Sequence, residues 1–201
     1  MKKILVALTL ASGLFLTGCS QSNEAATVGD FKITQTELQG SIDAVIAERA
    51  KVDTTQMQLE TGSSLNVSQL RFHLLGTLLR ELGQELKLNV TKAEIDSRRA
   101  SILEQVGGEA ALPNALVNAG IAPQDLDRYI EAIAYSDKIS QKLTAAGVTE
   151  DQLGQEIQKL VVAKAKEIGV TVNPRYGKWD ATTADVVAAD SAESAVTPAE
   201  K

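Results

Sequence analysis

The sequence is poor in the residues on which most catalytic and metal sites depend. It has 1 cysteine and 1 histidine among 201 residues, and aromatic residues make up only 3% of the chain. A disulfide needs two cysteines, and a structural zinc site usually takes four cysteine or histidine ligands. We therefore expect no metal site, no disulfide and no catalytic pair of cysteine and histidine.

Positive charge is also scarce. The chain has 20 Lys and Arg against 26 Asp and Glu, which gives a formal net charge of −6. A chain this acidic repels the phosphate backbone of DNA and RNA, because binding to nucleic acid depends on neutralising phosphates with basic side chains. Nucleic acid is therefore excluded as an expected partner.

The first 18 residues have the layout of a bacterial export signal. A basic start at Lys2 and Lys3 is followed by a mainly apolar run over residues 4–16, too short for a permanent membrane span of about 20 residues. The run ends in Leu16-Thr17-Gly18-Cys19, which resembles the lipobox of bacterial lipoproteins. We predict that residues 1–18 are removed and that Cys19 becomes the lipid-bearing N-terminus.

Lipidation would tether the protein to the cell membrane on its extracytoplasmic side without spanning it. Two or more acyl chains give stable anchoring, at about 0.8 kcal/mol for each buried methylene. Removal of the signal takes away two lysines and no acid, so the net charge of −6 becomes −8. Composition then predicts a flexible tether over residues 19–26, one domain over 27–180 and a disordered, alanine-rich acidic tail over 181–201.

Helix signals recur through residues 27–180. Capping-box patterns begin at Thr34, Thr91 and Thr149, each followed three residues later by Glu or Gln. Apolar residues recur at helical spacing after each of them. Further helices are predicted over about 66–87, 112–119 and 123–143, with a loop over 52–66. The sequence thus predicts a mainly α fold, an irregular bundle of about six helices.

Two short segments with alternating apolar residues, 28–33 and 170–173, predict strands at opposite ends of the helical block. A lone strand leaves its backbone donors unpaired, so we expect these two to pair with each other. Pro174 has no N–H group and is expected to end the pairing. The small two-stranded pairing should therefore bring the N-terminal and C-terminal segments together.

Three segments also carry a family resemblance. They are Val28-Gly29-Asp30-Phe31-Lys32-Ile33-Thr34 followed by Glu37-Leu38, then residues 89–95, then residues 170–177 with Trp179-Asp180. In this order they resemble the first strand and helix, an internal helix start and the returning segment of the SurA N-terminal domain family, in the SurA and PrsA class of exported chaperones. The resemblance implies a chaperone for unfolded or nascent exported proteins.

Many members of that class carry a further domain, a prolyl isomerase of the parvulin type. Such a domain would need on the order of 100 residues. The stretch from 106 to 149 supplies only 44, which already show helix signals, and the histidines of a parvulin site are absent from the sequence. We therefore predict the chaperone module alone, without enzymatic activity and without a cofactor.

Residues 66–87 form the most apolar segment after the export signal. Their leucines and Phe72 cover about 200° of the helix surface, twice the roughly 100° stripe that packs against one neighbour. One interpretation is a central helix covered on both flanks. The other is a helix of which one flank lines a groove for apolar polypeptide. The two interpretations can apply to different residues of the helix. The candidate polypeptide-binding residues are Phe72, Leu75, Leu79 and Leu82. His73, on the opposite face, is predicted to be a solvated surface residue.

Three classes of function remain open at this point. The favoured one is a membrane-anchored holdase or foldase that binds unfolded exported polypeptides by apolar contacts. The second is an adaptor or structural lipoprotein of the cell envelope that binds one folded partner. The third, less favoured, is a residual prolyl isomerase.

Overall fold

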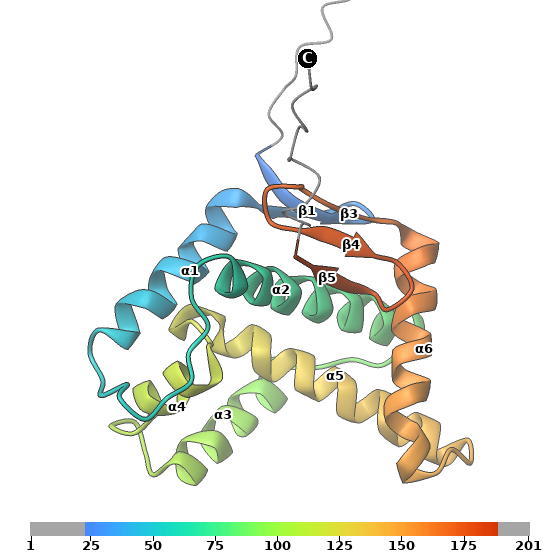
Figure 1. Cartoon of the computed structure of the whole chain (residues 1–201). Helices are drawn as coiled ribbons and strands as arrows, with labels where there is room; N and C mark the ends of the chain where they lie inside the picture. The colour runs from blue at the N-terminus through green and yellow to red at the C-terminus, as the bar shows by residue number, and fades with distance from the viewer. Residues whose placement is uncertain (1–22, 189–201) are drawn as a thin grey trace, which may run out of the picture.

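The computed structural model describes residues 23–188 (Figure 1). The predicted export signal, the lipobox with Cys19 and most of the predicted tail lie outside the described residues. Within them there are six α-helices and five short strands. The helices are α1 (Gln35–Arg49), α2 (Gly62–Glu85), α3 (Lys92–Val106), α4 (Leu112–Ala119), α5 (Leu126–Ala145) and α6 (Glu150–Ile168). A 3-10 turn, η1 (Pro123–Asp125), precedes α5, and the strands are β1 (Glu24–Val28), β2 (Phe31–Thr34), β3 (Val170–Val172), β4 (Lys178–Asp180) and β5 (Asp185–Val187).

The mainly α architecture is confirmed, and so is the meeting of the two ends of the chain. The strands β2, β1 and β3 form an antiparallel sheet in that order, in which Thr27 of β1 lies opposite Thr171 of β3. The predicted strand over 28–33 is wrong in detail, because Gly29, at a φ of 56°, turns the chain there and separates β1 from β2. The sheet therefore has three strands instead of two.

The folded domain begins earlier and ends later than its predicted limits of 27 and 180. Strand β1 starts at Glu24, inside the predicted tether, and the hairpin of β4 and β5 extends into the predicted tail. Ala25 and Val186 are both 0% exposed, although neither segment has much apolar bulk. Composition underestimates such strands, because backbone pairing and small side chains that fill tight spaces need no bulk.

The helix caps follow the threonines closely. The Thr91 pattern forms both halves of the capping box at the start of α3, and Thr34 accepts from the Glu37 backbone N–H at 3.0 Å at the start of α1. Thr149 makes no such cap, since its hydroxyl bonds the Gln152 side chain instead. Helix α2 begins at Gly62, within the predicted loop, and the short helix over 112–119 is confirmed as α4.

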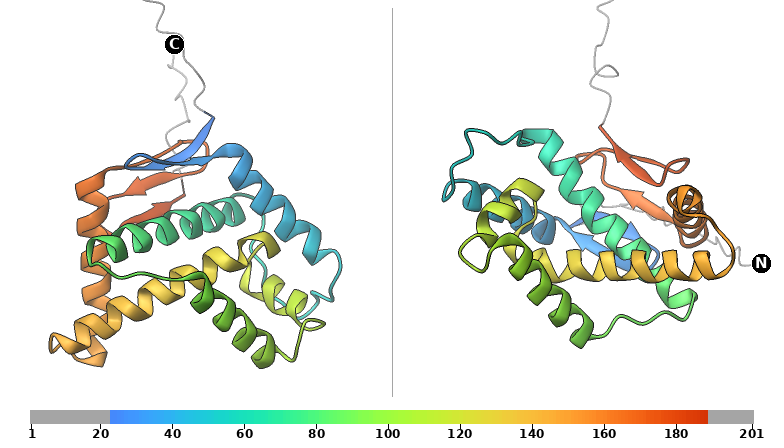
Figure 2. Two further views of the ribbon diagram at one scale, coloured as in Figure 1. Left: turned by 180° about the vertical axis from the view of Figure 1, so that it is seen from behind. Right: turned by 90° about the horizontal axis from the view of Figure 1, so that it is seen from below.

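Helix α2 is the centre of the core. It lies between the strands on one side and α5 on the other, and it also contacts α1 and α6 (Figures 1 and 2). The crossing with α5 is tight at Gly83, where an added Cβ would overlap the ring of Tyr135. The first interpretation of the apolar segment, a central helix covered on both flanks, therefore holds for most of its leucines.

Helix α3 is attached more loosely than the other helices. None of its residues is fully buried, and it packs mainly on α5 and α4. A second small apolar cluster, formed by Leu116, Ile121, Leu126 and Ile130, lies between these three helices. This cluster supports one wall of the cleft described below.

Candidate functional site

The four predicted polypeptide-binding residues lie on the same helix, α2, but they differ in exposure. Leu79 and Leu82 are only 6% and 3% exposed, so their assignment to an exposed groove is wrong. Leu75 is 42% exposed, on the surface of α2, while Phe72 is half-buried in the wall of a cleft that Leu75 does not line. Helical periodicity gave the direction of each side chain, but it could not show that neighbouring helices and strands cover most of these directions.

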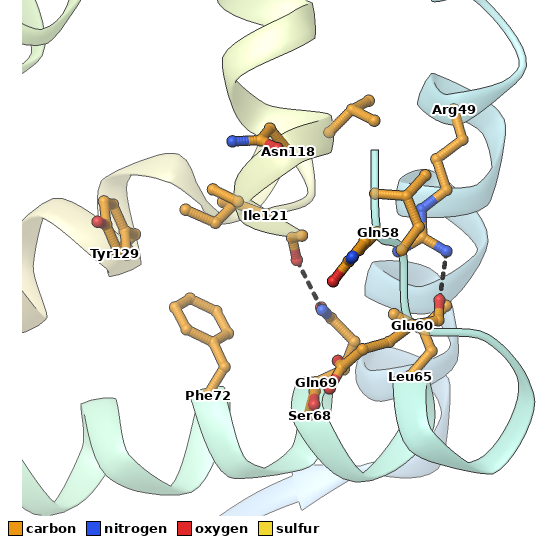
Figure 3. A pocket seen from close by; sticks show the side chains of 14 residues that line it. Arg49, Gln58, Glu60, Leu65, Ser68, Gln69, Phe72, Asn118, Ile121 and Tyr129 are labelled. Atoms are coloured by element: carbon orange, nitrogen blue, oxygen red, sulfur yellow. Dashed lines mark hydrogen bonds between the residues drawn. The ribbon is translucent and has the colours of Figure 1, made fainter. Parts of the chain in front are cut away.

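We name the cleft beside Phe72 the α2–α4 cleft (Figure 3). It lies between the first half of α2, the end of α4 with residues 119–121, and the loop that joins α1 to α2. Its volume is about 390 Å³, within the usual range for sites that hold small ligands. The larger apolar side chains of its lining are Leu59, Leu65, Phe72, Val117, Ile121 and the ring of Tyr129.

Gln69 supplies one polar group in the wall of the α2–α4 cleft. Its side chain is 4% exposed, and its Nε2 donates to the backbone carbonyl of Gly120 at 2.7 Å. Because a carbonyl can only accept, the amide nitrogen must face Gly120, and the Oε1 atom is left buried with no partner among residues 23–188. A buried acceptor without a donor costs about 1–3 kcal/mol.

Arg49 is the second such group, at the opposite end of the cleft from Tyr129 (Figure 3). Its Nη1 donates to the backbone carbonyl of Glu60 at 2.6 Å, which ties the end of α1 to the connecting loop. Its Nε is buried and has no partner among the described residues. Both atoms are covered from solvent in this conformation, so the side chains around them must rearrange before either can bind a ligand.

A cluster of polar side chains lies buried on another side of α2, and we call it the His73 cluster. The prediction of a solvated histidine is wrong, because His73 is 0% exposed. Its Nε2 lies 3.0 Å from the Ser41 hydroxyl oxygen, which is also 2.6 Å from an Asp125 carboxylate oxygen. Its Nδ1 lies 3.6 Å from Glu37 Oε1, and the same Glu37 oxygen accepts from Arg128 at 2.5 Å.

The surroundings of His73 determine its protonation. Burial lowers the pKa of His73 below its ordinary value, and the positive charge of Arg128 lowers it further, whereas Asp125 and Glu37 act in the opposite direction. If the Ser41 hydroxyl donates to Asp125, then a neutral His73 donates from Nε2 to Ser41, and its Nδ1 has no hydrogen-bond partner within residues 23–188, as observed. The folded protein therefore favours the neutral imidazole.

The His73 cluster resembles a nucleophile, base and acid arrangement only in its residue types. A catalytic serine must be reached by substrate, whereas Ser41 is 2% exposed and its neighbour His73 is fully buried. What the cluster does is join α1, α2 and the η1–α5 segment through polar contacts. Sequence patterns show little sign of this cluster, because Ser41 and Asp125 meet His73 only after three separate segments have packed together.

The described residues give two further findings. None of the helices within 23–188 is both long enough and apolar enough to cross a membrane. In the same part of the chain, no group of three or more His, Cys, Asp or Glu side chains is placed to hold a metal ion.

Comparisons of this chain with protein-family models, with curated proteins and with solved structures found no match.

Proposed function

We propose that this protein is a lipid-anchored, extracytoplasmic chaperone that holds unfolded exported polypeptides in the α2–α4 cleft without a cofactor. The observation that carries the proposal is the cleft itself. It joins an apolar surface around Phe72 and Ile121 to the unpaired buried oxygen of Gln69, in a volume of about 390 Å³. Apolar surface next to unpaired polar atoms suits a polypeptide, which offers side chains and backbone amides together.

The chemistry of the site favours holding over reaction. Aromatic and aliphatic side chains contact any apolar residue of a client with little selectivity, because dispersion and burial of apolar area are not directional. Once these atoms are uncovered, a backbone N–H of the client would donate to Gln69 Oε1, and a backbone carbonyl would accept from Arg49 Nε. Since these are groups that every polypeptide has, the cleft would accept unrelated unfolded sequences.

The anchor is the second part of the proposal, and it rests on the lipobox resemblance at Cys19. A lipid at this residue would concentrate the cleft at the membrane surface, where exported chains emerge. Changing Cys19 to Ala should release the protein from the membrane fraction, and mass spectrometry of the parent should find a diacylated N-terminal cysteine. Membrane fractionation that the change leaves intact would refute the anchor but not the cleft.

An aggregation assay tests the cleft. The chain from Ser20 to Lys201 contains every described residue, and it should slow light scattering by two unrelated denatured substrates. The change Asn118→Trp places a large ring in the lining from an exposed position on α4, and it should reduce the protection several-fold. The matched control Asn114→Trp lies exposed on the same helix, outside the lining, and should protect as well as the parent.

Two results would count against the proposal. Equal protection by the parent and by Asn118→Trp, with both proteins folded by circular dichroism, would show that clients do not use the α2–α4 cleft. Saturable binding to one folded envelope protein, with no protection of either denatured substrate, would replace the chaperone by the adaptor function.

A further inference from the structure

The chain enters the domain at a fixed point. Strand β1 is the middle strand of its sheet, with β2 on one side and β3 on the other. At its start the Asn23 carbonyl accepts from the Gln35 N–H at 2.8 Å, and the Glu24 carbonyl accepts from the Asn173 side chain at 3.2 Å. From Asn23 onward, the chain is therefore held in place by hydrogen bonds to the rest of the domain. We call this part of the domain, with the turn over 173–176 and the first turn of α1, the sheet end.

Little chain is left between this fixed point and the proposed lipid. From Cys19 to Asn23 there are four Cα–Cα steps, which span at most about 14 Å when fully extended. A domain of 166 residues has a radius of gyration of about 15 Å, and thus an outer radius of about 20 Å. Because the connection is shorter than the radius of the body that it carries, the domain cannot turn a distant side toward the bilayer.

We infer that the sheet end faces the lipid headgroups and that the α2–α4 cleft is held away from the membrane. This inference rests on the anchor in the proposed function. The tether predicted from the sequence, which ran to residue 26, would have allowed far more rotation. The strand pairing of Glu24, Ala25 and Ala26 removes that freedom.

The surface at the sheet end has groups that suit a headgroup layer. It contains a groove lined by Gln35, Thr36, Gln39, Gly40, Asp43, Arg175 and Tyr176. The Arg175 guanidinium is exposed and lies 6.0 Å from the centre of the Tyr176 ring. Arginine is favoured at the boundary between water and lipid, because it joins an apolar stem to a charged tip that reaches headgroup phosphates. Tyr176 is only 7% exposed and belongs to the core, so Arg175 is the residue of this pair that can reach the headgroups.

The cleft lies at the other end of α1. This helix starts at the sheet end with Gln35 and runs for 15 residues, about 22 Å, to Arg49 in the cleft wall. Figure 1 shows α1 leading away from the strands toward the loop and α4. In the inferred orientation the bilayer does not cover the cleft, and clients reach it from the aqueous side.

Energy transfer from tryptophan to the membrane tests the orientation. The chain has 1 cysteine, so the Cys19–Lys201 chain can be coupled through Cys19 to maleimide lipids in phosphatidylcholine vesicles that contain dansyl-labelled headgroups. The native donor is Trp179, the single tryptophan, on β4 next to β3. The comparison donor is Asn118→Trp in a Trp179→Phe background, on α4 at the cleft.

Transfer to the headgroups should be clearly stronger from Trp179 than from the Asn118→Trp donor. Insertion of a 20-residue Gly/Ser segment between Ser22 and Asn23 should abolish the difference, because the domain could then rotate. Equal transfer from both donors without the insertion, or stronger transfer from the Asn118→Trp donor, would overturn the inference. Since the coupling is chemical, this result is independent of lipidation in cells and of client protection, which the Cys19→Ala and aggregation tests report separately.

Discussion

Replacing His73 with glutamine should change how the stability of the protein depends on pH. The ordinary pKa of histidine is 6.5, and burial holds the pKa of His73 below this value in the folded state. Just below pH 6.5, His73 therefore binds a proton in the unfolded chain but stays neutral in the folded chain. As a result, the free energy of unfolding falls as the pH falls. One proton corresponds to a slope of at most about 1.4 kcal/mol per pH unit. The loss begins near pH 6.5 and ends at the lower pKa of the folded state.

The groups that face His73 are Glu37, Ser41, Asp125 and Arg128, and glutamine can still donate an N–H to Ser41 in place of Nε2. Urea unfolding of the parent and of His73→Gln, measured at half-unit steps from pH 7.5 to 5.5, isolates the effect, because the chain has 1 histidine. The parent should lose stability with acid more steeply than the variant. Parallel curves for the two proteins would refute the assignment of a neutral, buried His73.

Two further predictions concern local packing, and thermal or urea unfolding checks both. The change Thr91→Ala should lower the free energy of unfolding by about 1 kcal/mol, because Thr91 completes a capping box. Thr149→Ala should lower it by less, because the Thr149 hydroxyl makes no cap bond. Equal losses of stability in the two variants would contradict this difference in capping. The change Gly83→Ala should destabilise the protein by about 1–3 kcal/mol, because the added methyl group would overlap the ring of Tyr135. Gly154→Ala should stabilise the protein by up to about 1 kcal/mol, because Gly154 lies in α6 with open space around it. A neutral Gly83→Ala would show that α2 and α5 pack less tightly at this point than the structure describes.

Local signals in the sequence predicted the helices well. Thr91 with Glu94, Pro123 and Gly169 mark helix ends through interactions with nearby residues, and such interactions can be read directly from spacing. The pairing of the N-terminal and C-terminal segments could be predicted for a general reason, since each strand needed a partner and no other strand pattern was recognised.

The site could be predicted only in part. Phe72 lines the cleft. Its neighbours Gln69 and Arg49 matter because each has a buried polar atom without a hydrogen-bond partner in the described part of the chain, and no sequence pattern can show a missing partner. His73 was misplaced for the opposite reason. A helical wheel assigned it to the polar side of α2, while Ser41 and Asp125, from distant parts of the chain, make a polar interior there.

The pairing of Thr27 with Thr171 also determines when the protein can finish folding. Their hydroxyl oxygens lie 2.7 Å apart although 144 positions separate them along the chain. Contacts between such distant positions slow folding, because a long loop must close before they form. Strand β1 can pair with β2 as soon as both have been made, but its other edge cannot pair until α6 and β3 are available, so this sheet is among the last parts of the domain to be completed.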